Sequence, residues 1–265
     1  MKTEDMITAV RWYEGDVDDN TGPVFHDSRA YVTYNAVFFE GLENEKAKIR
    51  EKKYLNPAFL QHCEEIYGDH SLTSHIMAAM ENCPLSHPID TYRVERLFDF
   101  QMMQKQHRTI AFTSTSKAGF LGDYTDKDGI VLMVFHLSPS ILCLDLSAFL
   151  PEYKKSGEAE ILLPPQLIME SKEVPLSDTD RTIVDMNGDP PRGKYEIDVH
   201  AENESQIDVK RPSPYIFTLA EKAISALNAG KMPQDNECHA LLQCKAYCRF
   251  LALHTIAQHT KKRMS

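Results

Sequence analysis

The spacing of apolar residues predicts helices in two parts of the chain. In residues 57–83, apolar positions recur at steps of three and four and pause near Gly68, which predicts two consecutive amphipathic helices. A second apolar stripe covers residues 216–227. Residues 241–256 are apolar around most of the helix circumference. We expect this last helix to be buried or to pack against a partner.

The middle of the chain has the pattern of β-strands. From residue 91 to about 176, short apolar and β-branched runs are separated by Gly, Pro, Asp and Ser, which is typical of strands and turns. Further strands are expected at 181–186 and 194–199, on either side of a segment rich in Pro and Gly. Because the strands are grouped between groups of helices, the sequence predicts an α+β fold.

Charge and hydropathy exclude some classes of function. The chain carries 29 Lys and Arg against 39 Asp and Glu, so it lacks the general basic surface that nucleic acid requires. No stretch approaches the ~18 apolar residues of a membrane span, and the first ten residues do not resemble a secretory signal. We therefore expect a soluble, cytoplasmic protein that binds no nucleic acid and spans no membrane.

Two segments invite comparison with metal sites, and neither has the full ligand pattern. The stretch from Asp16 to Gly22 begins like a calcium loop, but Thr21 stands where that loop needs Gly. Among six cysteines, Cys244 and Cys248 share a helix face while Cys238 does not. We expect a solvated turn in the first segment, reduced core thiols in the second, and no metal.

Two glutamates precede an apolar run in the stretch GEAEILLPP. If this stretch is a strand, Glu158 and Glu160 leave the same face, with α-carbons about 6.5 Å apart. Their carboxylates then repel each other unless a cationic group lies between them. The ordinary alternative is an exposed strand face, since charges usually mark solvent.

Two other polar groups come earlier in the chain. Arg93 follows an aromatic residue at the start of an expected strand, and residues 113–116 form a run of hydroxyl side chains. A guanidinium suits an anion because it presents five donors in a planar fork. The ordinary alternative for Arg93 is an ion pair with Glu95 or Asp99, and Arg96 is a competitor for the same role.

The order of these motifs resembles the signature of the mono-ADP-ribosyltransferases, the branch that includes arginine-modifying bacterial toxins and vertebrate ecto-enzymes. The matching elements are aromatic–Arg at 92–93, Ser–Thr–Ser at 114–116 and Glu–x–Glu at 158–160. The resemblance covers residues 31–176, beginning with YVTYNAVFFEG, which is similar to the first helix of the family. One departure is Val94, where many members have Gly.

The resemblance implies a catalytic core of two packed β-sheets with flanking helices. We expect an N-terminal lead segment over residues 1–30, an ADP-ribosyltransferase-like catalytic domain over 31–212 and a helical C-terminal extension over 213–265. This extension is expected to pack on or beside the core. Its last helix is also a candidate surface for a partner or for self-association.

The resemblance also implies an activity, the transfer of ADP-ribose from NAD⁺ to a protein side chain, with arginine as the first candidate acceptor. Breaking the bond between nicotinamide and ribose builds positive charge on the sugar, which a fixed carboxylate stabilises. Glu160 is expected to supply that carboxylate and to bind the ribose 2′-hydroxyl. Glu158 is expected to hold and partly deprotonate the incoming guanidinium.

Other roles follow from the resemblance. Arg93, beside Tyr92, is expected to bind the NAD⁺ phosphates. Ser114 is expected to fix Glu160 and the ribose through its hydroxyl, with Thr115 shaping the same turn. The ordinary reading of this hydroxyl cluster is a turn or strand edge rich in Ser and Thr.

Two aromatic residues complete the expected site. Phe120 stands where the family places a ring near the nicotinamide, and its alternative is a core residue. Tyr153 resembles a substrate-recognising aromatic residue, and its alternative is an exposed tyrosine.

Other functions stay open at this point. NAD⁺ is the implied substrate, and neither metal nor flavin is implied. An NAD glycohydrolase would use water as the acceptor, and a non-catalytic member of the fold would bind a partner through its last helix. By analogy with bacterial effectors, delivery into the cytosol of a host cell is a further expectation.

Overall fold

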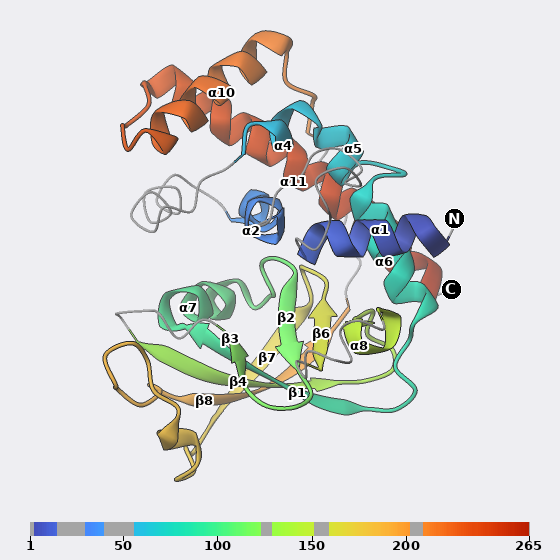
Figure 1. Cartoon of the computed structure of the whole chain (residues 1–265), viewed down its shortest axis with the longest axis vertical. Helices are drawn as coiled ribbons and strands as arrows, with labels where there is room; N and C mark the ends of the chain where they lie inside the picture. Colours follow the sequence, from blue (N-terminus) through green and yellow to red (C-terminus); the bar gives the residue numbers. More distant parts are fainter. Residues whose placement is uncertain are drawn as a thin grey trace. The chain divides into compact units, whose positions relative to one another are not determined.

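The fold combines helices with one β-sheet, so the predicted α+β class is confirmed (Figure 1). The chain divides into two compact units, one of residues 1–78 with 203–265 and one of residues 79–202. The first unit is helical and the second contains the sheet. The structure is a computed structural model that describes residues 3–14, 30–39, 56–122, 129–150, 159–201 and 209–264.

The helical unit is built from both ends of the chain. The helices predicted in residues 57–83, 216–227 and 241–256 are confirmed, whereas the first helix was not predicted. That helix buries Met6, Ala9, Val10 and Tyr13, which recur at steps of three, one and three. The helices are α1 (Thr3–Glu14), α2 (Ala30–Asn35), η1 (Ala36–Phe38), α4 (Ala58–Gln61), α5 (Cys63–Tyr67), α6 (Leu72–Asn82), α10 (Pro214–Asn228) and α11 (Asp235–Met264).

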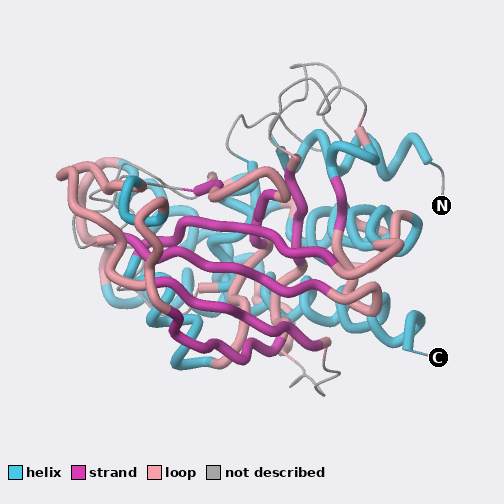
Figure 2. The backbone as a smooth tube through the Cα atoms, turned by 90° about the horizontal axis from the view of Figure 1, so that it is seen from below, coloured by secondary structure: helices cyan, strands magenta, loops and turns pink. Residues whose placement is uncertain are grey.

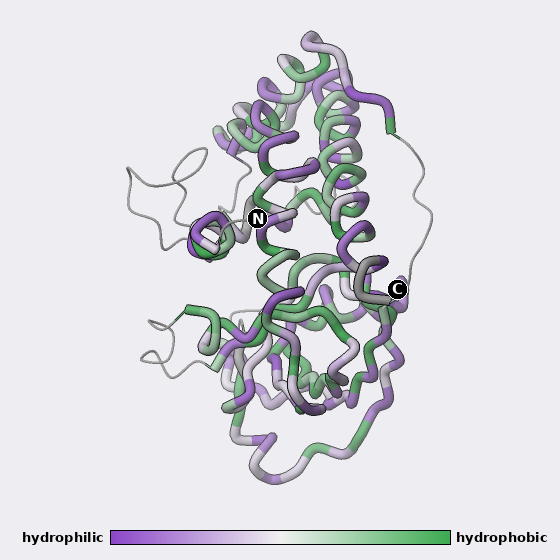
Figure 3. Tube along the Cα trace, turned by 90° about the vertical axis from the view of Figure 1, so that its right-hand side faces the viewer, coloured by the Kyte–Doolittle hydropathy of each residue, from purple (hydrophilic) through white to green (hydrophobic). Residues whose placement is uncertain are grey.

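The C-terminal helix α11 is covered within its own unit. It packs against α10, α4, α5 and η1. The Thr255 hydroxyl donates to the Tyr67 carbonyl at 3.1 Å, and Ser74 Oγ lies 3.2 Å from His259 Nε2. Hydrophobic and hydrophilic residues are mixed along this helix (Figure 3). Of the helices that the structure describes, none has both the length and the apolarity to cross a membrane.

The predicted domain boundaries at residues 30 and 212 do not coincide with the boundaries of the compact units. Helices α10 and α11 share a unit with the helices of the first 78 residues, because those helices cover α11. As functional domains, the segments 1–30, 31–212 and 213–265 stay a prediction.

The cysteines behave as core residues, as the sequence predicts. All six lie in described segments as free thiols, and all but Cys83 are buried. Burial raises the pKa of the Cys244 thiol to about 12, so it is protonated at neutral pH. The described segments hold no group of three or more His, Cys, Asp or Glu arranged to bind a metal. Residues 16–22, the calcium-like stretch, lie outside those segments.

The second unit is organised around a sheet with the strand order β5-β6-β2-β1-β4-β8-β7, in which β3 pairs with β1. Figure 2 shows its long strands side by side. The elements of this unit are β1 (Ile89–Arg96), α7 (Leu97–Gln106), β2 (Thr113–Ser116), β3 (Leu121–Gly122), β4 (Ile130–Leu137), β5 (Leu144–Asp145), α8 (Leu146–Phe149), β6 (Glu160–Leu163), β7 (Ile168–Val174), η2 (Asp180–Thr182) and β8 (Lys194–His200).

The sheet has two arms that meet at β1 and β2. Strand β1 pairs with β4 along its whole length, and β8 and β7 continue this long arm. Strands β2, β6 and β5 form the short arm. The pairing between β1 and β2 in the described residues is Tyr92 with Ser116, and Figure 1 shows β2 and β6 running across the direction of β1. The two expected sheets are thus two arms of one hydrogen-bonded network.

One predicted strand is wrong. Residues 181–186 form the end of η2 and a turn. The Asp185 carboxylate accepts the backbone N–H groups of Asn187 at 2.8 Å and Asp189 at 3.0 Å. Such local side-chain bonds compete with the pairing of a strand. Ile183 packs against the buried cluster of β1 and β4 instead of pairing in the sheet.

Thr109 ties the end of β6 to the segment before β2. Its hydroxyl donates to the Pro164 carbonyl at 3.2 Å and accepts the Leu167 N–H at 3.0 Å. Thr109 is fully buried, so water cannot take the place of this hydroxyl. The Thr109 hydroxyl therefore adds two buried hydrogen bonds to the backbone bonds that Thr109 makes with Gln166 and Leu167 in the turn from β6 to β7.

Replacing this side chain tests that contribution. Thr109→Val keeps the shape of the residue but leaves the Leu167 N–H and the Pro164 carbonyl without their partner. We expect the free energy of unfolding, measured by urea denaturation, to fall by about 1–3 kcal/mol. The control Thr182→Val, at an exposed hydroxyl, should change it by less than about 0.5 kcal/mol. Equal losses in the two variants would contradict this role of Thr109.

Candidate active site

The three predicted motifs meet where the two arms of the sheet join. Tyr92 pairs with Ser116 across β1 and β2, and Ser116 pairs with Glu160 across β2 and β6. Directly paired residues of antiparallel strands project to the same face. Tyr92, Ser116 and Glu160 therefore lie in one row on one face, although 68 residues separate the first from the last.

Arg93 is held by two hydrogen bonds. Its Nε donates to Glu95 Oε2 at 2.7 Å, and its Nη1 donates to the Ser114 carbonyl oxygen at 2.7 Å. Glu95 is buried, so water screens this ion pair less than it screens a surface pair. The ion pair is the ordinary alternative named for Arg93. The bond to Ser114 goes beyond that alternative, because it connects the first motif with the second.

Arg96 has a different environment. It is three residues from Arg93 on the same strand, so the two side chains leave opposite faces. Arg96 Nε donates to Asp99 Oδ2 at 2.7 Å, at the start of α7. Burial and the charge of Glu95 raise the pKa of Asp99, against the opposing effect of Arg96 and Arg93. These contacts place Arg96 at the helix start, whereas Arg93 is the arginine that bonds to the second motif, through the Ser114 carbonyl.

Glu160 is a buried carboxylate on a fixed backbone. It is the first residue of β6 and is 6% exposed. After Glu160 in the chain, the Ile161 carbonyl accepts a hydrogen bond from the Thr115 hydroxyl at 3.1 Å. Before Glu160, the Ala159 carbonyl accepts a hydrogen bond from the Lys117 N–H at 3.0 Å. A charge held in this way does not have to reorganise during a reaction, which is what electrostatic catalysis requires.

The register places Ser116, and not Ser114, directly opposite Glu160. Ser114 pairs with Leu162, which puts it diagonal to Glu160 on the same face, about 7–8 Å away. A hydrogen bond from Ser114 to Glu160 stays a prediction. Sequence reasoning gave Ser116 no role, because a run of hydroxyl residues does not reveal which of them faces the glutamate.

Phe120 contacts both Tyr92 and the core. Its ring centroid lies 5.4 Å from that of Tyr92, with an edge-to-face angle of 71° between the rings. Lys194 Nζ lies 5.8 Å from the Phe120 centroid. The ring is partly buried against the cluster of Val94, Ile130 and Leu132. Phe120 is thus a core residue that also extends the face carrying Tyr92.

Ala159 corrects the geometry assumed for the two glutamates. β6 begins at Glu160, and Ala159 has a φ of +47°, in the left-handed region. The two-residue repeat of a strand therefore does not extend to Glu158, and the prediction of one continuous strand through both glutamates is wrong at Ala159. Glu158 and Tyr153 lie outside the described residues, so their predicted roles stay predictions.

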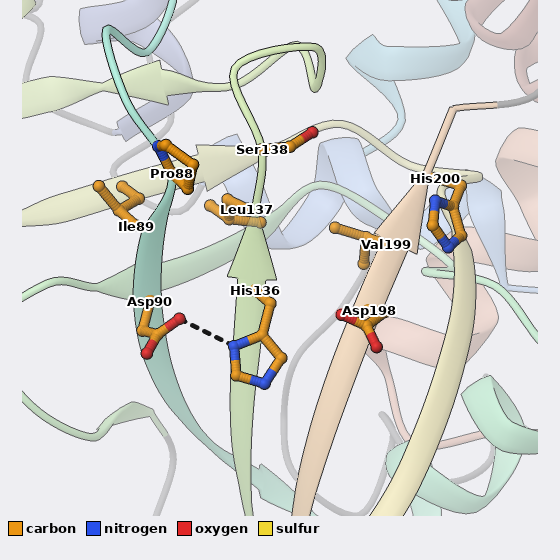
Figure 4. A pocket seen from close by; sticks show the side chains of 9 residues that line it. All are labelled: Pro88, Ile89, Asp90, His136, Leu137, Ser138, Asp198, Val199 and His200. Carbon is orange, nitrogen blue, oxygen red and sulfur yellow. Dashed lines mark hydrogen bonds and ion pairs between the residues drawn. The ribbon is translucent and has the colours of Figure 1, made fainter.

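A separate pocket of about 360 Å³ lies at the end of the sheet where β1 begins (Figure 4). Asp90, His136 and Asp198 are paired across three strands there, and His136 Nδ1 lies 2.8 Å from Asp90 Oδ1. The lining of this pocket includes none of the predicted site residues.

Comparisons with known proteins give distant likenesses. No family model and no curated protein matches the chain. Among solved structures, it is similar to the catalytic domain of VahC from Aeromonas hydrophila, with 17% identity, a TM-score of 0.43, and coverage of 76% of this chain and 100% of the other. It is similar to the Salmonella SpvB ATR domain, with 15% identity, a TM-score of 0.42 and coverage of 76% and 100%.

A third likeness is to Plx2a, an ADP-ribosyltransferase toxin from Paenibacillus larvae, with 15% identity, a TM-score of 0.34, and coverage of 74% of this chain and 97% of the other. Values this low do not assign the chain to a family. The function has to be inferred from the site itself.

The two arginines can be separated by conservative changes. Arg93→Lys keeps the charge but loses the planar fork that suits a diphosphate and that reaches Ser114, so we expect NAD⁺ affinity to fall about tenfold or more. Arg96→Lys should change it by less than about twofold, since a lysine there can still pair with Asp99. Isothermal titration calorimetry measures both. Equal losses, or the reverse order, would move the phosphate-binding role to Arg96.

Proposed function

We propose that this protein transfers ADP-ribose from NAD⁺ to a protein side chain, with arginine as the first candidate acceptor. One observation carries the proposal. The Tyr92–Ser116–Glu160 row, with Arg93 bonded to Ser114, brings the three signature motifs together at one joint of the sheet. An anion-binding fork and a buried carboxylate are the two groups that cleavage of NAD⁺ needs from a protein.

The donor half of the reaction uses Glu160. As the bond between nicotinamide and ribose breaks, the leaving nicotinamide takes the bonding electron pair and becomes neutral, and positive charge develops on the sugar. The Glu160 carboxylate, buried and fixed by β2, stabilises that charge. Arg93 binds the phosphates of the same molecule. When NAD⁺ binds, the guanidinium donates hydrogen bonds to phosphate oxygens. These bonds either add to its bond with the Glu95 carboxylate or replace it.

The acceptor half uses Glu158. A guanidinium nitrogen of the acceptor forms the new bond to the sugar carbon and gives up one proton, which a nearby carboxylate accepts. Two carboxylates close in sequence suit a cationic acceptor better than they suit water. The arginine preference and delivery into the cytosol of a host cell are supported by the sequence resemblance.

The first test removes the donor charge. Glu160→Gln nearly preserves the shape of the side chain, so we expect folding to be retained and the rate of nicotinamide release to fall by about 10²-fold or more. The matched control is Glu170→Gln, at an exposed glutamate of β7, which should leave the rate unchanged. Full activity of Glu160→Gln would refute the role of Glu160. A wild-type protein that releases no nicotinamide would instead favour a non-catalytic binding protein.

The second test separates protein modification from hydrolysis. Glu158→Gln removes the carboxylate proposed for the acceptor and keeps the one under the ribose. We expect transfer of labelled ADP-ribose to protein to fall by about tenfold or more, while slow release of nicotinamide to water continues. Both products are measured in one reaction. Equal loss of both would show that the glutamates act together on the donor, and no loss would remove the support for arginine. A wild type that only hydrolyses NAD⁺ would be a glycohydrolase.

A further inference from the structure

Lys117 makes two contacts that surround the start of β6. Its backbone N–H donates to the Ala159 carbonyl at 3.0 Å, one position beyond the Ser116–Glu160 pair. Its side-chain Nζ lies 2.5 Å from Asp145 Oδ2, and the two side chains are 33% and 20% exposed. Lys117, the residue that follows β2, is thus bonded to the residue before β6 and to β5, the strand on the far side of β6.

The ion pair crosses the back of the strand that carries Glu160. β6 lies between β2 and β5, and Ile161 pairs with Thr115 on one side and with Asp145 on the other. Lys117 follows the end of β2, and its ion pair with Asp145 places its side chain on the face of Asp145. Glu160 is next to Ile161 and projects to the opposite face. The side chains of Lys117 and Asp145 therefore bridge β6 on the face that Glu160 does not use.

Asp145 is itself held in place. Its Oδ1 accepts the Ala148 N–H at 3.2 Å and the Ser147 hydroxyl at 2.7 Å, which caps the start of α8. Burial acts to raise the pKa of Asp145, but the bonds from Lys117, Ser147 and Ala148 outweigh burial and lower it. Asp145 is therefore ionised at neutral pH. The bridge joins a capped helix start to the end of β2.

We propose that Lys117 is a positioning residue for Glu160. Its N–H fixes Ala159 in the left-handed conformation, and its ammonium group holds β2 and β5 together across β6. A partly exposed ion pair contributes little to the free energy of unfolding of the whole protein. Loss of the ion pair should therefore change the backbone only at the start of β6. The consequence for catalysis rests on the proposed function, whereas the consequence for the backbone does not.

The test combines kinetics with a structural measurement. Lys117→Met keeps the backbone N–H and most of the side-chain length but removes the ammonium group. We expect kcat for nicotinamide release to fall about tenfold, because small displacements of a catalytic group are costly, with the KM for NAD⁺ changed by less than about twofold. Hydrogen–deuterium exchange in residues 159–163 should become faster. Lys117→Arg, which keeps a cation, should restore most of both properties.

Two further variants make the result specific. Asp90→Asn removes the partner of His136 elsewhere in the sheet and should leave kcat and exchange in β6 unchanged. Lys117→Met combined with Asp145→Asn should be no more impaired than Lys117→Met alone, since both changes remove the same bridge.

Three outcomes would overturn the inference. The first is unchanged exchange in residues 159–163, which counts whether or not the protein is an enzyme. The second is faster exchange with unchanged kcat, which would make the ion pair purely structural. The third is a change in the KM for NAD⁺ with an unchanged kcat. An inactive wild type would refute the proposed function, while the exchange measurement would still decide whether Lys117 holds β6.

Discussion

The site depends on the backbone pairing that joins the two arms of the sheet. Strand β2 is only four residues long, yet Ser116 pairs with Tyr92 on one side and with Glu160 on the other. Because a shift of one residue sends every side chain of a strand to the other face, this register decides whether Glu160 and Tyr92 share a face at all. The bond from Arg93 to the Ser114 carbonyl and the Thr115 hydroxyl bond to β6 both reinforce the same register.

The sequence predicted the parts of the fold that have a strong local hydrophobic pattern. The structure contains the predicted strands at 130–137 and 194–200 and the predicted helices at 214–228 and 235–264. In each of these segments, the local hydrophobic pattern agrees with the packing of the folded chain. The strand expected at 181–186 failed because Asp185 satisfies nearby N–H groups locally, which a hydrophobic pattern does not reveal. Helix α1 was not predicted, although its buried residues Met6, Ala9, Val10 and Tyr13 have the spacing of a helix face.

The candidate site was predictable in its residue types but not in its details. The side chains of the three motifs could be named from their order along the chain. Which hydroxyl faces Glu160 depends on strand register, which is a long-range property. The choice between Arg93 and Arg96 depends on the long-range contacts of each side chain, and the structure connects Arg93 to Ser114. Lys117 could not be found from sequence, since its partner Asp145 is 28 residues away and belongs to another strand.

The left-handed backbone at Ala159 has a consequence for how such sites diverge in sequence. A residue with a β-carbon loses about 1–2 kcal/mol in this region, and a β-branched residue fits it worst. Glycine and asparagine are the residues that enter it most easily. The position between the two glutamates is therefore open to small or flexible residues of unrelated chemistry and closed to valine and isoleucine. The main-chain conformation thus limits which residues can replace Ala159 during evolution. The chemical character of the side chain at this position does not limit them.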